Sequence, residues 1–295
     1  FTYKLETSGA TVVTVGDLPP GVVFDPVTST IFGTATTPGL YTVPVILFDE
    51  LGEGKEFSLT FVVSPTSVAL GDAIGLPGIP AVFGGDAPWD FELSDTNDLP
   101  DSEDTSAARS AINLGDNELS VFGFDDLGAG VLVFDWKSAS EEGGDRLWFN
   151  QGGDVPQTWD AFISGQREWG RTAVVLPKAS NNVRWIYSKN EIETVGEDRG
   201  LVDNVELIEF DKYQESLVRA GNIEGFEFEI DSRTSFLPYE FPIGSPSPDG
   251  TREMLRSSTI GNGQTVSLSG WLDGPGTFSF RAFNFAEAGD IFEFL

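Results

Sequence analysis

Arg109–Phe149 reads RSAINLGDNELSVFGFDDLGAGVLVFDWKSASEEGGDRLWF, and Arg256–Phe294 reads RSSTIGNGQTVSLSGWLDGPGTFSFRAFNFAEAGDIFEF. The two stretches share an Arg-Ser pair, glycine turns and aromatic residues at strand positions. Their offset of roughly 145 residues exceeds the period of solenoid repeats, which is about 20–50 residues. We therefore predict a duplicated domain, of which the second copy contains only the first part.

The alignment of the two copies needs two one-residue slips, after which glycine and aromatic positions coincide. The aligned pairs are Gly123-Phe124 with Gly270-Trp271, Phe134 with Phe280, and Gly144-Asp145 with Gly289-Asp290. Alternating strand-like residues and glycine turns dominate both copies, which favours strands. No segment shows a sustained helical period.

The charge balance excludes some partners. The chain has 295 residues with 47 acidic and 17 basic side chains, a formal net charge of −30. Nucleic acids and anionic membrane surfaces need clustered Lys and Arg, so neither is expected as a partner. An acidic surface of this kind suits a secreted protein in a salty medium.

The absence of Cys and His limits the chemistry. No disulfide, thiol nucleophile or Cys-ligated zinc can form, and the commonest general base is missing. No apolar run is long enough to span a membrane. The chain starts and ends inside strand-like patterns, so we expect an excerpt of a longer polypeptide. Acidic pairs are too many to single out a catalytic one, and we expect no enzymatic activity.

Residues 1–65 contain short strand-like runs separated by turn signals, which predicts a small β-sandwich. Residues 18–52, LPPGVVFDPVTSTIFGTATTPGLYTVPVILFDELG, resemble the immunoglobulin-like, cadherin-like repeats of bacterial surface proteins. Ser29 stands where that family usually has Gly. The resemblance implies a spacer or adhesion module without an active site.

Residues 66–210 contain a longer series of strand-like runs, which predicts an antiparallel jelly-roll sandwich. The segments GAGVLVFDWKSASEEGGDRLWF, NNVRWIYSKN and EDRGLVDNVEL resemble the MAM-like and concanavalin-like modules of extracellular bacterial proteins. Asn182 stands where that family commonly has His. Such modules occur in adhesins, proteases and polysaccharide-degrading enzymes, so the fold does not specify a function.

Residues 211–223 form a charged connector, and residues 224–295 form the incomplete second copy. Phe226–Ile230 mirrors the alternation of Trp89–Leu93. The Pro-rich tract 237–250 occupies the place that an acidic loop, residues 94–104, has in copy one. The counterpart of residues 150–210 is missing, which leaves strand edges and an apolar face open. The chain continues, another chain completes the fold, or the half-domain packs against the preceding domain; we expect the first.

Three residues are candidates for binding carbohydrate. Trp159 and Trp169 fall near predicted turns, where an indole can stack on a sugar ring, whereas tryptophans inside strand motifs, such as Trp136, fill the core. Arg109 recurs as Arg256 in the second copy, and a guanidinium can bind a carboxylate-bearing sugar in a bidentate manner. A structural ion pair is the alternative for Arg109.

Acidic side chains give two candidate Ca²⁺ sites, because Ca²⁺ prefers several oxygen ligands. The first is the loop that contains Asp95, Asp98, Asp101 and Asp104, and the second contains Asp198 and Asp203. EF-hand spacing is absent from both, and solvated loops or structural carboxylates are the alternative. No cofactor is required by any feature of the sequence.

The leading hypothesis is a structural or adhesive segment of a large secreted or cell-surface bacterial protein. Its partners would be other domains of the same chain or neighbouring subunits. A second hypothesis is an accessory carbohydrate-binding region of an extracellular polysaccharide-degrading enzyme. A third is a filament subunit completed by strand exchange at the open C-terminal half.

Overall fold

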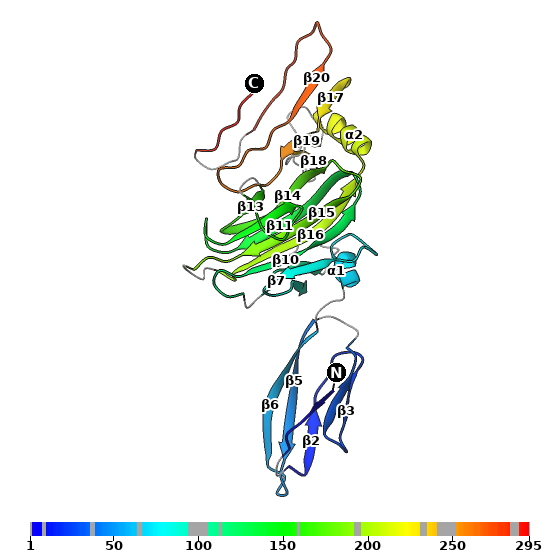
Figure 1. Cartoon of the computed structure of the whole chain (residues 1–295), viewed down its shortest axis with the longest axis vertical. Coiled ribbons are helices and arrows are strands. Elements are labelled where there is room, and N and C mark those ends of the chain that lie inside the picture. The colour runs from blue at the N-terminus through cyan, green and yellow to red at the C-terminus, as the bar shows by residue number, and fades with distance from the viewer. Residues whose placement is uncertain are drawn as a thin grey trace.

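The computed structural model describes most of the chain, as strands, loops and two helices (Figure 1). The described residues are 2–7, 10–35, 39–63, 67–93, 106–111, 114–157, 160–191, 196–230, 235–240, 252–283 and 289–294. Strands far outnumber helices among them, and every strand pair is antiparallel. The predicted all-β class is confirmed.

The N-terminal module contains two three-stranded sheets. One sheet has the order β1 (Thr2–Lys4), β4 (Thr30–Gly33) and β3 (Val22–Asp25), and the other has the order β2 (Val12–Val15), β5 (Gly39–Phe48) and β6 (Gly54–Val63). The buried residues Leu5, Val22, Ile31 and Val45 form the core between them. Gly33 has a positive φ of 138°, and a Cβ there would lie 2.3 Å from the Gly21 carbonyl oxygen, so this turn requires glycine.

The second module is a sandwich of two five-stranded sheets. We call the first the front sheet, with the order β13 (Ala161–Ile163), β12 (Arg146–Gln151), β15 (Asn181–Ser188), β10 (Leu119–Leu127) and β7 (Val82–Gly85). We call the second the back sheet, with the order β14 (Gln166–Leu176), β11 (Gly130–Ala139), β16 (Arg199–Ile208), β9 (Ser106–Arg109) and β8 (Asp90–Leu93). Neighbours in each sheet are mostly distant in sequence, as the predicted jelly-roll sandwich requires.

Aromatic residues fill the space between the front and back sheets. The fully buried Trp185 lies at the centre, with ring centroids 4.9 Å from Phe122, 5.1 Å from Phe134 and 5.3 Å from Phe149. Helix α1 (Ser67–Ala73) closes one edge of this core through Leu70. The inward face of each strand therefore follows the period-2 alternation seen in the sequence.

The C-terminal part begins with helix α2 (Phe210–Gly221), where the sequence predicted only a charged connector. Tyr213, Leu217 and Ala220 are buried at helical spacing, and the helix ends at Asn222 in the left-handed conformation. The expectation that no segment has a helical period is therefore wrong here. Three turns of helix with mostly charged exposed residues give a weak sequence signal.

Four short strands follow α2 in two two-stranded sheets. β17 (Phe226–Glu229) pairs with β20 (Ser269–Leu272), and β18 (Phe236–Glu240) pairs with β19 (Glu253–Ser257). The sequence predicted a loop over the β18 residues, which is wrong. Residues 273–283 and 289–294 form no strand and run as an extended trace near the C-terminus in Figure 1.

The strand pairing shows how the two copies correspond. β17 pairs with β20 as β7 pairs with β10, and β18 pairs with β19 as β8 pairs with β9. The prediction that Phe226–Ile230 mirrors Trp89–Leu93 is therefore wrong, since β18 is the counterpart of β8. Leu70 of α1 and Leu217 of α2 are both fully buried before these strands, so α2 is the first element of the second copy.

A second core joins the C-terminal part to the outer surface of the back sheet. Val131, Val133, Ala173 and Val175 point away from the first core, yet all are buried. Tyr213, Leu217, Phe228 and Leu237 cover them. Of the three predicted outcomes for the half-domain, packing against the preceding domain is the one present in this structure, although it leaves residues 271–283 and 289–294 largely exposed.

Candidate functional site

The outer surface of the front sheet carries an aromatic group that the sequence analysis did not select. Leu147 and Phe149 point into the core, so Arg146 and Trp148 of β12 point outward. Phe162 on β13 lies opposite Trp148 in the strand register. These three side chains are all half-buried, and we call them the front-sheet aromatic group.

In this group the Arg146 guanidinium lies over two rings that contact each other, with 4.9 Å between the Trp148 and Phe162 centroids. The Arg146 guanidinium carbon lies 5.2 Å from the Trp148 ring centroid and 4.8 Å from the Phe162 ring centroid. Trp148 Nε1 donates a hydrogen bond of 3.0 Å to Ser188 Oγ, which fixes the indole. Arg146 Nη2 donates to the Gly143 carbonyl at 3.0 Å, and its Nε has no hydrogen-bond partner among the described residues. The group thus combines partly exposed ring surface with a guanidinium whose Nε is buried and has no hydrogen-bond partner among the described residues.

Beside this group, Arg184 of β15 forms a charged cluster that is satisfied internally. Its Nη2 lies 2.7 Å from Asp125 Oδ1 and its Nε lies 2.8 Å from Asp154 Oδ1. Its Nη1 donates to the carbonyl oxygens of Phe124 and Val183. Because each of its nitrogens has a partner, Arg184 stabilises the sheet and offers little to a ligand.

Gly123 makes room for this arrangement. A Cβ at this position would lie 1.9 Å from the Val183 carbonyl oxygen and 2.9 Å from Arg184 Cδ. Any side chain would force β10 away from β15. The glycine shared by the two copies at this position is therefore a packing requirement in copy one.

The two carbohydrate candidates that the structure describes, Arg109 and Trp169, lie apart from each other. Arg109 of β9 pairs with Asp90 at 3.9 Å, and Trp169 is half-buried in β14. In the back sheet β9 and β14 are separated by β16 and β11, so their axes lie about 14 Å apart at the usual strand spacing. The third candidate, Trp159, lies outside the described residues.

The two Asp candidates for Ca²⁺ that the structure describes have other partners. Asp198 accepts a hydrogen bond of 3.3 Å from the Tyr187 hydroxyl and forms an ion pair with Lys189. Asp203 is fully buried, and its Oδ1 accepts the Asn204 amide at 2.7 Å. Asp95, Asp98, Asp101 and Asp104 lie outside the described residues. Within the described ranges, no group of three or more carboxylates is placed to hold a metal ion.

A buried polar cluster closes the end of the sandwich near Asp198. Asp145 is fully buried, its Oδ1 accepts the Asn190 amide at 2.8 Å, and its Oδ2 has no hydrogen-bond partner among the described residues. Burial, and then the charge of Asp145, raise the pKa of the Tyr187 hydroxyl. The cluster holds the loops after β11 and β15 together.

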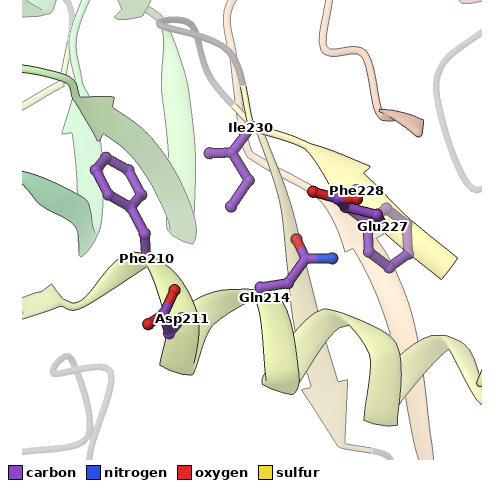
Figure 2. A pocket seen from close by; sticks show the side chains of 6 residues that line it. All are labelled: Phe210, Asp211, Gln214, Glu227, Phe228 and Ile230. Atoms are coloured by element: carbon purple, nitrogen blue, oxygen red, sulfur yellow. The ribbon is translucent and has the colours of Figure 1, made fainter. Parts of the chain in front are cut away.

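Figure 2 shows a shallow pocket between α2 and β17. Its lining residues are Phe210, Asp211, Gln214, Glu227, Phe228 and Ile230. With its amide turned to match its neighbours, Gln214 donates to the Phe228 carbonyl at 3.2 Å and accepts the Phe228 amide at 2.8 Å. Gln214 thus occupies the outer edge of β17, and the pocket has a structural explanation.

The sequence does contain a signal for the front-sheet aromatic group. In RLWFNQ, the alternation around Leu147 and Phe149 places Trp148 outward, although tryptophans in strand motifs were assigned to the core. That assignment holds for Trp136 and Trp185, which are fully buried. It is wrong for Trp148, which is half-buried on the outer surface.

Comparison with known proteins identifies one family in the chain. Residues 1–64 match the family model described as "Putative Ig domain", which agrees with the two three-stranded sheets found there. The match covers only the N-terminal module, so the rest of the chain has no family assignment from it. A search of curated proteins finds no match.

Three solved structures illustrate the likenesses found. The secreted serine protease VesC from Vibrio cholerae is 13% identical with a TM-score of 0.35, over 71% of this chain and 46% of that one. A carbohydrate-binding module of the β-sandwich superfamily is 14% identical with a TM-score of 0.30, over 68% and 86%. CBM51-2 and INT domains of Clostridium perfringens ZmpB, in complex with GlcNAc, are 13% identical with a TM-score of 0.30, over 73% and 44%.

The chain therefore spans about half the length of the protease that it matches. Among the described residues, no helix has the length and apolar character needed to cross a bilayer.

Proposed function

We propose that this chain is a non-enzymatic structural segment of an extracellular protein, in which an Ig-like module precedes two β-sandwich copies joined as one rigid body. The observation that carries the proposal is the second core, which both copies build together. A flexible tether would leave each copy with its own core, whereas a shared core fixes their orientation.

The apolar part of this junction is well buried. Val131, Val133, Ala173 and Val175 of the back sheet are at most 2% exposed beneath the C-terminal part. Burying one aliphatic side chain contributes roughly 1.5–3 kcal/mol. Four such residues and their covering partners therefore contribute enough to hold the two copies together in solution.

Hydrogen bonds to the edge strand β14 also fix the orientation of the C-terminal part on the sandwich. Ser235 N donates to the Ala173 carbonyl at 3.0 Å, and Thr259 N donates to the Arg171 carbonyl at 3.0 Å. Gln264 Nε2 donates to the Asp160 carbonyl at 2.6 Å, just before β13 at the edge of the front sheet. The C-terminal part thus covers a sheet edge that would otherwise be open to pairing.

The composition supports an extracellular location and a passive role. The net charge of −30 keeps the chain soluble at moderate salt and disfavours nucleic acid and anionic membrane surfaces. The absence of His and Cys removes the usual nucleophile and base pairs. We propose that the natural partners are neighbouring domains or subunits.

Small-angle scattering of the chain and of Leu237→Asp tests this proposal. Leu237 is 3% exposed in the shared core, and Glu240→Ala on the same strand is the matched control. We expect a larger radius of gyration and faster proteolysis between residues 209 and 258 for Leu237→Asp only. Proteolysis of the native chain between residues 209 and 258 at the rate of Leu237→Asp would overturn the proposal.

A second candidate function is carbohydrate binding, which the front-sheet aromatic group supports. Sugar rings stack on partly exposed aromatic surfaces, and the half-buried guanidinium of Arg146 beside the rings can donate to a hydroxyl or carboxylate. A broad glycan array, probed with the native chain and with Trp148→Ala, tests it. Trp159→Ala and Trp169→Ala test the two earlier candidates, and Val27→Ser, 91% exposed in the N-terminal module, is the control.

Loss of glycan binding in Trp148→Ala alone would support the front-sheet site. Absence of binding across the array would refute carbohydrate recognition at this site. Binding that is lost in Trp159→Ala or Trp169→Ala, and kept in Trp148→Ala, would move the site to the earlier candidates.

A further inference from the structure

A short segment of the C-terminal part, residues 259–264, is tied to the edge of the first sandwich, and we call it the docking segment. At its start, Thr259 N donates to the Arg171 carbonyl at 3.0 Å. At its end, the Gln264 side-chain oxygen accepts the Phe162 amide at 3.1 Å. The docking segment is thus held to copy one at both ends.

The middle of the docking segment is a turn with an Asn-Gly sequence. Gln264 N donates to the Gly261 carbonyl at 3.3 Å and closes the turn, in which Asn262 and Gly263 are the two central residues. Both central residues are exposed, and Gly263 has a φ of 76°, as the third position of a type II turn requires. Asn262 is the only Asn in the chain that is followed by Gly.

Asn262 contacts a carboxylate of copy one. Its Nδ2 donates to Glu142 Oε1 at 2.8 Å, and Arg167 Nη2 lies 3.5 Å from the same oxygen. The Glu142 side chain is 53% exposed, so solvent screens these interactions and each contributes little to stability. The contact nevertheless places any carboxylate formed at position 262 beside an existing one.

An exposed Asn-Gly turn has the chemistry of spontaneous deamidation. The Gly263 nitrogen attacks Asn262 Cγ, a new C–N bond closes a cyclic imide, and the Cγ–Nδ2 bond breaks as ammonia leaves with the Gly263 amide proton. Water then opens the ring at the side-chain carbonyl, which gives aspartate, or at the backbone carbonyl, which gives isoaspartate. No oxidant or reductant takes part, and water is the only co-reactant.

The nucleophile of this reaction is accessible. Glycine has no Cβ to shield its nitrogen. An ideal Cβ on Gly263 would meet nothing within 4 Å, and the Gly263 amide donates no hydrogen bond to any described residue. The attack therefore breaks no existing contact of that amide.

We propose that Asn262 is a modification site whose deamidation releases the docking segment from copy one, an inference that rests on the shared junction of the proposed function. Isoaspartate routes the main chain through the side chain and lengthens the turn, which moves Gln264 away from the Phe162 amide. Either product also puts a carboxylate beside Glu142 where an amide donor stood, and like charges at this distance repel each other. Because ammonia is lost to the solvent, the release is irreversible.

Ageing of the whole chain at mildly alkaline pH tests the proposal, and peptide mass spectrometry locates the product. Asn117 is the internal control: it is also exposed and its Nδ2 donates to Glu191 Oε1 at 2.7 Å, but Glu118 follows it instead of glycine. We expect Asn262 to deamidate at least about tenfold faster than Asn117.

Hydrogen exchange of the aged chain measures the structural consequence. We expect faster exchange in the modified chain for the peptides that contain Phe162 and Thr259. Aged Asn262→Gln should show no such change, because it keeps a side-chain amide but forms a ring far more slowly. Asn262→Asp carries the new charge without the longer main chain, so we expect a smaller increase in exchange than isoaspartate causes.

Two results would overturn the proposal while leaving the shared junction intact. One is deamidation at Asn262 no faster than at Asn117, and the other is unchanged exchange around Phe162 and Thr259 in the modified chain. If the unaged chain already exchanges these amides as fast as the modified one, the docking segment is not held to copy one. That result would overturn both this proposal and the shared junction.

Discussion

Leu217→Ala separates the stability of the two copies. Leu217 is fully buried in α2 and packs in the shared core, so the truncation is expected to cost about 2–5 kcal/mol. A loss of about 3 kcal/mol raises the population of the open C-terminal part by roughly 100-fold. The expected result is loss of hydrogen-exchange protection in α2 and β17–β19, with β10 and β15 much less affected.

The matched substitution is Leu70→Ala, at the equivalent position of α1. Leu70 is fully buried in the first core, so a similar cost is expected there. Because the shared core is built on the back sheet, this substitution should lower protection in both copies. Glu215→Ala, exposed on α2, is the control and should change the free energy of unfolding by less than about 0.5 kcal/mol.

Hydrogen exchange with peptide-level mass spectrometry reads both regions in one experiment. We predict that Leu217→Ala lowers hydrogen-exchange protection only in the C-terminal part, whereas Leu70→Ala lowers it in both copies. If Leu217→Ala lowers protection equally in β15 and α2, the chain unfolds as one unit and the reasoning fails. If Leu70→Ala leaves α2 fully protected, the second copy does not depend on the first.

Two further predictions concern Tyr213 and Gly123. Burial raises the pKa of Tyr213 from its ordinary 10.0 to about 12, so the contribution of its neutral hydroxyl is complete below pH about 10 and is lost as pH rises to about 12. Tyr213→Phe should remove one ionisation step near pH 12 from the tyrosinate absorbance titration; loss of a step near pH 10 instead would contradict the burial. Gly123→Ala should lower the unfolding free energy of the sandwich by about 3 kcal/mol or more in urea denaturation, because the added Cβ meets the Val183 carbonyl. Gly128→Ala, with nothing within 4 Å, is its control, and equal effects would refute the steric explanation.

The fold of the first copy was largely predictable, because the alternation in β10, β11 and β12 encodes both strand and inward face. The pairing of the C-terminal strands was not predictable, since the alternation of Phe226–Ile230 fits the counterpart of either β7 or β8. Only the partner strand decides between them, and that contact is distant in sequence. Tertiary packing determines such choices more than local propensity does.

The candidate site was likewise predictable from the sequence only in part. Sequence alone cannot show that Arg109 is paired with Asp90, or that Arg184 has a partner for each nitrogen. The outward direction of Trp148 was encoded by its neighbours Leu147 and Phe149, but its contact with the Phe162 ring depends on the edge strand β13. The alternation along a strand thus predicts on which side of the sheet a side chain lies, whereas its contact partners depend on which strands are neighbours in the sheet.

The shared core also imposes an order on biosynthesis. A chain made from its N-terminus completes β16 at Ile208 before any residue of α2 is available. In that interval Val131, Val133 and Val175 face solvent on a finished sheet. Until the next residues emerge, this apolar surface of the nascent sandwich can associate with other apolar surfaces. The helix that begins at Phe210 shortens the time for which the surface is exposed. Because α2 starts directly after β16, it can cover the apolar outer surface of the back sheet soon after that sheet is complete.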